Sequence, residues 1–124
     1  MKKILIVDDE VHIRALMAEA LSSLEESDVK ILVAKDGKEA YEIARREVPD
    51  LIFLDVVMPE MNGFEVAERL KLNAITSNCY IIFLTSKGEK IDKRKGFEVG
   101  CDEYAHKPFD PDWLVEKATE VLFK

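Results

Sequence analysis

The chain has 124 residues, a formal net charge of −7, and a composition that is 48% hydrophobic and 35% charged. A chain of this length fits one domain with a sizeable core, and its composition excludes a disordered protein. The acidic balance disfavours direct binding to nucleic acid or to an anionic membrane surface. No apolar run reaches the roughly 18 residues of a membrane span, and the N-terminus has no export signal. We therefore expect a single cytoplasmic domain over residues 1–124.

Short apolar segments rich in Ile and Val alternate with longer segments in which apolar residues recur at helical spacing. Short apolar runs bounded by polar residues are typical of buried parallel strands. The expected strands are Ile4–Val7, Val29–Ala34, Leu51–Leu54, Ile81–Leu84 and, as a weaker run, Glu103–His106. The first helical pattern runs from Ile13 to Leu24. The alternation predicts an α/β domain with five strands, five helices and a parallel sheet covered on both faces.

Capping residues mark several helix boundaries. Asp36 is expected to cap the start of a helix, and Asp110 followed by Pro111 is typical of a cap and a first helical residue. Gly100 fits the end of the helix that precedes the last strand. These boundaries separate the helical segments from the expected strands.

Polar side chains follow the carboxyl ends of four expected strands. Asp8 and Asp9 follow the first strand, Asp55 the third, Thr85 the fourth and Lys107 the fifth. In an open parallel sheet, ligands bind beyond the carboxyl ends of the strands, where the strand order reverses. We expect these five side chains to share one edge of the sheet.

These residue types have a shared chemical logic. Clustered carboxylates repel one another, and a hard cation such as Mg²⁺ relieves that repulsion with oxygen ligands. A carboxylate beside such a cation can attack phosphorus, while Lys107 and Thr85 hold the oxygens of the transferred group. Taken alone, Asp8 and Asp9 are typical of a helix cap, and Lys107 of a solvated lysine. The joint occurrence at four strand ends favours a phosphoryl-transfer site.

The chain resembles, over nearly its whole length, the receiver domain of two-component response regulators. The matching segments are Ile4–Glu10 (ILIVDDE), Pro49–Gly63 (PDLIFLDVVMPEMNG), Leu84–Ser86 (LTS) and Gly100–Phe109 (GCDEYAHKPF). They occur in the family's order and at its spacing. The resemblance implies a doubly wound, flavodoxin-like sheet in the order 2-1-3-4-5, as in the single-domain chemotaxis regulators.

The resemblance also implies a role for each site residue. Asp55 corresponds to the phosphoacceptor, and Lys107 to the partner of the phosphoryl group. Asp8, Asp9 and Asp55, with the backbone carbonyl of Val57, correspond to the ligands of Mg²⁺. The phosphoryl donor would be a sensor histidine kinase or a phosphotransfer protein. The domain is expected to be a phosphoacceptor that assists its own phosphorylation and dephosphorylation, not an enzyme acting on another substrate.

A switch and an output surface follow from the same resemblance. Thr85 corresponds to the hydroxyl that senses the phosphoryl group, and Tyr104 to the aromatic residue that turns inward in response. His106 shares the strand face of Tyr104. The bond from Lys107 to Pro108 is expected to be cis. A downstream protein target is expected on the fourth helix, fifth strand and fifth helix, without direct contact to nucleic acid or a membrane.

The fourth helix has two features with open interpretations. Gly96 could weaken the helix or allow close packing, and Gly88 lies at its expected start. Its basic residues form a solvated face or part of a docking surface for an acidic partner: Lys90, Lys93, Arg94 and Lys95.

The chain departs from the family pattern at a few positions. Val57 stands where Asp or Asn is frequent, Tyr80 replaces a frequent proline, and the connection from Leu24 to Asp28 is slightly long. Two other functions fit less well. A Mg²⁺-dependent phosphatase would place a DxD pattern on the first strand, and a flavin or nucleotide binder would need a phosphate loop there. Adjacent carboxylates occupy that place instead.

Overall fold

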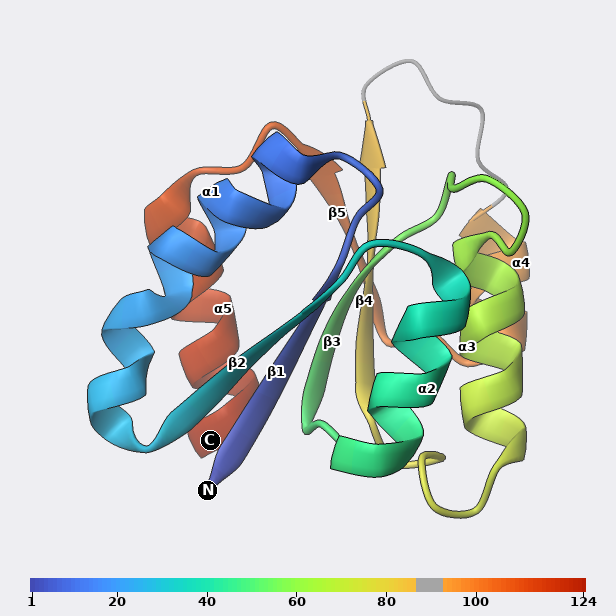
Figure 1. Ribbon diagram of the computed structural model, residues 1–124, viewed down its shortest axis with the longest axis horizontal. Coiled ribbons are helices and arrows are strands. Elements are labelled where there is room, and N and C mark those ends of the chain that lie inside the picture. Colours follow the sequence, from blue (N-terminus) through green and yellow to red (C-terminus); the bar gives the residue numbers. More distant parts are fainter. Residues whose placement is uncertain (87–92) are drawn as a thin grey trace.

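The computed structural model describes residues 1–86 and 93–124, and over these residues five parallel strands form one sheet (Figure 1). The strands are β1 (Lys2–Val7), β2 (Val29–Ala34), β3 (Leu51–Asp55), β4 (Tyr80–Ser86) and β5 (Glu103–Lys107). Their order is β2-β1-β3-β4-β5, which confirms the expected topology. Lys87, Gly88 and Lys90 lie outside the described residues.

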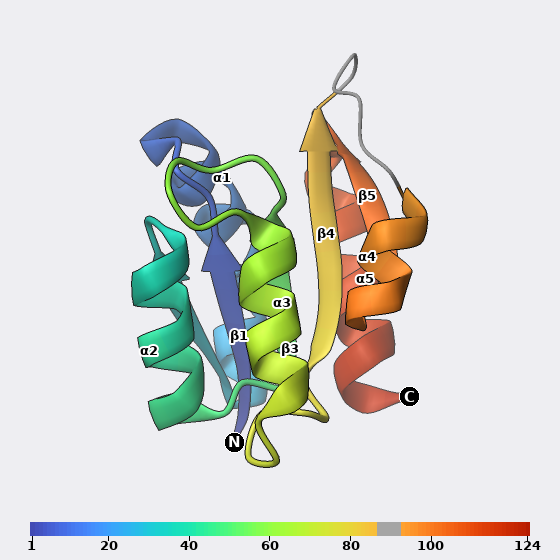
Figure 2. The same cartoon turned by 90° about the vertical axis from the view of Figure 1, so that its right-hand side faces the viewer.

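Helices cover both faces of the sheet. Within the described ranges they are α1 (Val11–Leu21), α2 (Gly37–Glu47), α3 (Gly63–Leu72), α4 (Lys93–Val99) and α5 (Pro111–Phe123). Helices α1 and α5 pack side by side on one face, and α2, α3 and α4 cover the other (Figures 1 and 2). No helix in the described part of the chain combines the length and apolar character needed to cross a bilayer.

The strands supply two cores because successive side chains point to opposite faces. In β3, Ile52 and Leu54 join the core under α2 and α3, while Leu51 and Phe53 join the core under α1 and α5. All of these side chains are fully buried. Strands buried on both faces must be apolar throughout, which is why they appear in the sequence as continuous runs.

The expected helix caps are present. The Asp36 carboxylate accepts a hydrogen bond from the backbone N–H of Glu39 at 2.8 Å, and Asp110 caps α5 with Pro111 in its first turn. Gly100 follows α4 with a φ of +106°, a left-handed conformation that favours glycine. The peptide bond from Lys107 to Pro108 is cis, as expected.

The first helix is shorter than its apolar pattern predicts. Helix α1 ends at Leu21, and a 3₁₀ helix spans Ser22–Ser27. Leu24 is buried from within this 3₁₀ segment, so the apolar spacing continues although the helix type changes. This 3₁₀ segment accounts for the long connection into β2, and Asp28 follows it in a left-handed conformation.

Candidate phosphoacceptor and metal site

Three carboxylates converge beyond the carboxyl ends of two adjacent strands. The register of β1 and β3 pairs Val7 with Leu54, so the residues that follow them, Asp8 and Asp55, lie next to each other. One oxygen from each of Asp8, Asp9 and Asp55 lies within 4.8 Å of the other two. Asp8 and Asp55 are 0% and 3% exposed, whereas Asp9 is exposed to solvent. Two carboxylates thus lie in a poorly solvated position, where their mutual repulsion is strong.

The edge strand contributes the countercharge. Lys107, at the end of β5, places its Nζ 2.6 Å from Asp8 Oδ2 and 3.6 Å from Asp55 Oδ2. Burial alone would lower the pKa of Lys107, but its contact with Asp8 and the charge of Asp55 outweigh burial and leave that pKa raised. The lysine is therefore a permanent cation between the two buried carboxylates.

Asp55 has the strongly perturbed carboxyl group of the site. Burial, followed by the charge of Asp8, raises the pKa of Asp55 from its ordinary 3.8 to about 8, although Lys107 opposes this rise. Without a further cation, burial and the charge of Asp8 therefore favour the protonated form of the Asp55 carboxyl. A carboxyl group attacks phosphorus as the anion, and a second positive charge beside Asp55 would favour that anionic form.

The donor set fits a hard divalent cation. Asp8 Oδ1 accepts a hydrogen bond from the backbone N–H of Glu10 at 2.9 Å. Among the residues that the structure describes, none forms a hydrogen bond of good geometry with the fully buried Oδ2 of Asp8. Its 2.6 Å contact with Lys107 is a charge interaction, which holds without hydrogen-bond alignment. Mg²⁺ prefers oxygen ligands. This cluster supplies carboxylate oxygens, and one of them, Asp8 Oδ2, lacks a well-aligned hydrogen bond within the described residues.

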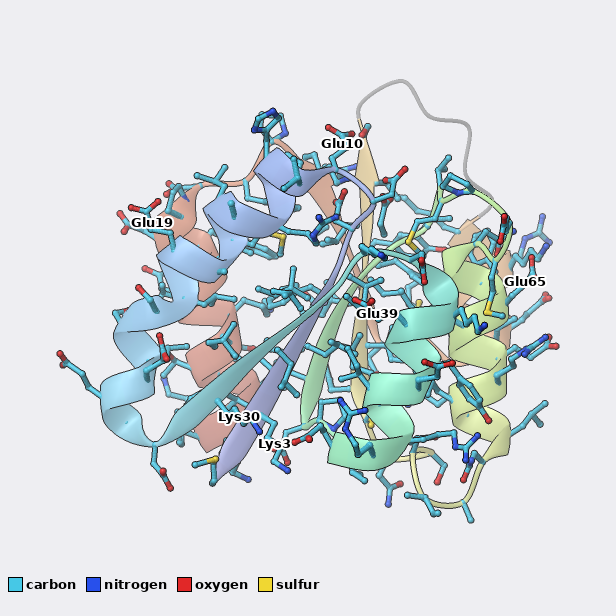
Figure 3. The ribbon with its side chains drawn as sticks, viewed as in Figure 1. Lys3, Glu10, Glu19, Lys30, Glu39 and Glu65 are labelled. Atoms are coloured by element: carbon cyan, nitrogen blue, oxygen red, sulfur yellow. The ribbon has the colours of Figure 1, made fainter. Side chains whose placement is uncertain are left out.

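A group of basic side chains lies at the end of the molecule away from the carboxylate cluster (Figure 3). Glu10 lies at the acidic end of the molecule, while Lys3 and Lys30 lie at the opposite end (Figure 3). Both lysines pair with Glu47, at 3.3 Å and 3.2 Å. The carboxylate cluster is therefore spatially separate from this basic group.

The loop after β3 folds back tightly over the strand end. The backbone N–H of Gly63 donates to the carbonyl of Val56 at 2.8 Å, and a Cβ on Gly63 would overlap the carbonyl oxygen of Asp55. Val57 donates its backbone N–H to Asp55 Oδ1 at 3.3 Å, while its side chain is 51% exposed. Glycine at position 63 is thus required for the loop to pass so close to Asp55.

The two expected switch residues lie on the last two strands. Thr85 is buried, and its hydrogen bonds go to β5: Oγ1 lies 2.9 Å from His106 Nδ1 and 3.5 Å from the carbonyl oxygen of Ala105. Tyr104 is half-buried between Phe83 and Phe97, with both ring centroids 5.5 Å from its own.

The Tyr104 hydroxyl reaches α4. It donates to the carbonyl of Lys93 at 3.3 Å, and the Lys93 ammonium lies 5.8 Å from the Tyr104 ring centre. Gly96 packs directly against the same ring. Tyr104 therefore connects the edge strand to α4 within the expected output surface.

Two contacts of the site go beyond the sequence analysis. Sequence reasoning places His106 on the face of Tyr104 but gives it no contact with Thr85. It also leaves the reason for Gly96 open. The signal that could have found His106 is strand register, because Thr85 and His106 are directly paired in the parallel ladder.

Comparison with known proteins assigns the family. A model of the response regulator receiver domain matches residues 4–119. The chain belongs to this family, and its fold with the acidic pocket of Asp8, Asp9 and Asp55 is that of a phosphoacceptor in response regulator signalling, not of a classical enzyme. Membership implies a histidine kinase as a partner, and Mg²⁺ is the metal typical of receiver domains.

Similar proteins come from several bacteria. The phosphate regulon transcriptional regulatory protein PhoB of Pseudomonas aeruginosa is 44% identical, over 98% of this chain and 52% of that protein. The alkaline phosphatase synthesis transcriptional regulatory protein PhoP of Bacillus subtilis is also 44% identical, over 98% and 48%. The chain thus spans about half the length of these curated relatives. The structure of Vibrio cholerae chemotaxis protein CheY4 matches with a TM-score of 0.86 and 32% identity, over 98% of this chain and 99% of that one.

Proposed function

We propose that Asp55 accepts a phosphoryl group from the phosphohistidine of a sensor kinase or phosphotransfer protein. The observation that carries this proposal is the convergence of three carboxylates with Lys107 at the end of the central strand. Asp8, Asp9 and Asp55, with the backbone carbonyl of Val57, would hold Mg²⁺. When bound, the cation would neutralise the carboxylates and favour the anionic form of Asp55.

Asp55 and Lys107 have different roles in the proposed phosphoryl transfer. An oxygen of Asp55 attacks phosphorus, a P–O bond forms, and the P–N bond to the donor histidine breaks. Lys107 moves its positive charge from the carboxylates to the phosphoryl oxygens, where new negative charge gathers. Burial of Asp55 limits the access of water, so the acyl phosphate persists long enough to act as a signal.

The proposal includes a route from the site to a partner. The hydroxyl of Thr85 turns toward the phosphoryl oxygens, and Tyr104 turns inward into the space that it leaves. The face formed by α4, β5 and α5 then binds a downstream protein. Exposed cations of α4 suit an acidic partner: Lys93, Arg94 and Lys95. We assign residues 1–124 to one receiver domain.

Mass spectrometry after incubation with acetyl phosphate and Mg²⁺ tests the acceptor. The wild-type protein should gain the mass of one phosphoryl group, and Asp55→Asn should gain none. Asp110→Asn is the matched control, because it makes the same chemical change at a helix cap where Asn serves equally well. Undiminished labelling of Asp55→Asn would overturn the assignment.

A further inference from the structure

The side chains of Thr85 and His106 form a contact that links the phosphoryl-sensing position to the protein surface. The two residues are register partners in β4 and β5, so their side chains leave the same face of the sheet. Thr85 Oγ1 lies 2.9 Å from His106 Nδ1, and its other contact, to the carbonyl of Ala105, is 3.5 Å long. Because hydrogen bonds weaken at such lengths, the imidazole is the partner that fixes the direction of the hydroxyl.

The direction of this hydrogen bond depends on which ring nitrogen of His106 carries the proton. Thr85 is 2% exposed, and its hydroxyl has one proton, which it can donate to one acceptor at a time. In a neutral imidazole, one ring nitrogen accepts while the other carries the proton. The shorter distance favours donation from Thr85 to Nδ1, with the imidazole proton on Nε2.

We propose that His106 is a positioning residue that holds the Thr85 hydroxyl on β5 in the resting protein. A phosphoryl group on Asp55 competes with the imidazole for the same proton, so this inference rests on the proposed function of Asp55. Strand register supports this competition between the phosphoryl group and the imidazole. Asp55 pairs with Leu84, so Thr85, the next residue of β4, lies close to Asp55. A charged phosphoryl oxygen is a stronger acceptor than a neutral imidazole, and it takes the proton when it is present.

Loss of this hydrogen bond changes the molecular surface. The exposed imidazole of His106 lines a groove of about 460 Å³ together with Tyr104, Phe109 and Trp113. The rings of Phe109 and Trp113 are stacked there, with centroids 6.4 Å apart. Release from Thr85 frees Nδ1 to bind another donor in the groove. Phosphorylation therefore alters a polar group beside α5, in addition to the aromatic switch of Tyr104.

Imidazole ¹⁵N spectra of the wild-type protein test the hydrogen bond directly. The chain has two histidines, so a His12→Gln variant assigns the signals of His106. At mildly alkaline pH, the resting protein should show an unprotonated, hydrogen-bonded Nδ1. Addition of Mg²⁺ and beryllofluoride, a phosphoryl mimic, should shift Nδ1 to the value of a nitrogen without that bond. A proton on Nδ1 in the resting state would overturn the inference.

The affinity for beryllofluoride tests the competition. His106→Phe removes the acceptor, so Thr85 has no such bond to surrender, and the variant should bind the mimic about fivefold more tightly. His106→Asn retains an acceptor near the Nδ1 position and should restore an affinity close to that of the wild type. The fluorescence of Trp113, the one tryptophan in the sequence, reports binding from within the groove. Equal affinities of the Phe and Asn variants would contradict the positioning role.

The outcomes separate this inference from the function on which it rests. A wild-type protein that binds the mimic while the nitrogens of His106 stay unchanged would overturn the role of His106 alone. A wild-type protein that neither binds the mimic nor gains mass with acetyl phosphate would overturn the proposed function, and the competition with it.

Discussion

Gly96 lies against the phenol ring of Tyr104 so closely that a Cβ at position 96 would overlap the Tyr104 hydroxyl. The same Cβ would lie 3.0 Å from a ring carbon of Phe83, so it could not avoid Tyr104 by moving toward Phe83. Of the two explanations that the sequence leaves open for this glycine, the contact favours close packing. The Tyr104 ring can therefore occupy its resting position only because residue 96 in α4 is a glycine, which has no Cβ.

Gly96→Ala should destabilise the protein although alanine favours helix by about 1 kcal/mol. The overlap with Tyr104 should cost about 1–3 kcal/mol, as is typical of an overpacked core. Urea unfolding of Gly96→Ala, Tyr104→Ala and the double variant measures the coupling. In the Tyr104→Ala background, the Gly96→Ala change should lose most of its cost. If Gly96 served only to weaken the helix, alanine would stabilise both backgrounds equally.

The raised pKa of Asp55 predicts a pH dependence of stability in the absence of metal. The folded-state pKa of about 8 lies above the ordinary value of 3.8, so the folded protein retains a proton that the unfolded chain releases. This contribution to stability is complete below about pH 4 and is lost as the pH rises to about 8. A shift of this size is worth on the order of a few kcal/mol.

Asp55→Asn should remove this pH dependence, because an amide does not titrate. In EDTA, the free energy of unfolding of the wild type should fall across the window, while that of Asp55→Asn should fall much less. Asp110→Asn should follow the wild type. Parallel pH curves for the wild type and Asp55→Asn would show that the Asp55 pKa is not raised in the folded state.

Mg²⁺ should stabilise the fold by mass action and should be required for phosphorylation. At a concentration 100 times the Kd, a ligand that binds only the folded protein adds about 2.7 kcal/mol to its stability. Asp9→Ala should reduce this gain, and since Asp9 is exposed, the variant should still fold. Glu10→Ala, an exposed carboxylate outside the cluster, is the control. Labelling by acetyl phosphate that proceeds equally well in EDTA would contradict the metal's role.

Val57 should make dephosphorylation slow. Hydrolysis needs a water molecule in line with phosphorus, and the exposed valine side chain beside Asp55 offers that water no hydrogen bond. Val57→Asn supplies one and should speed the loss of phosphate about tenfold, which corresponds to about 1.4 kcal/mol in the transition state. The sequence places Lys87 two residues after Thr85, where its long side chain is expected to crowd the same water, but Lys87 lies outside the described residues.

The decay of the phosphorylated protein, followed by mass spectrometry, measures this effect. Val57→Ala is the matched control, since it shortens the side chain without adding a polar group, and it should decay as the wild type does. Equal decay rates for Val57→Asn and the wild type would remove the argument.

The sequence was sufficient to predict the sheet and the residues at its active edge. Buried parallel strands must be apolar on both faces, so Leu51–Leu54 could be recognised without knowledge of its neighbours. Asp8 and Asp55 could be placed together because the carboxyl ends of parallel strands meet at one edge. These inferences depend on topology: the alternation of strands and helices predicts the parallel sheet, and the resemblance to receiver domains implies the strand order.

Contacts that depend on register and on atomic packing could not be predicted. The pairing of Thr85 with His106 requires a known register between β4 and β5, and a shift of one residue would have placed Lys107 opposite Thr85. The role of Gly96 depends on the position of one ring. The change from α-helix to 3₁₀ helix after Leu21 preserves the burial of Leu24, so the apolar pattern does not reveal it.

The ion pair between Lys107 and Asp8 also bears on how the domain is made. Asp8 follows the first strand of the sheet, and in the finished fold its carboxylate is fully buried. Burial of that carboxylate without a countercharge would be costly, and the cation that touches it lies at the end of β5. A nascent chain that stops after β4 lacks this cation. The buried carboxylate at the end of β1 therefore gains its countercharge only after β5 has been synthesised.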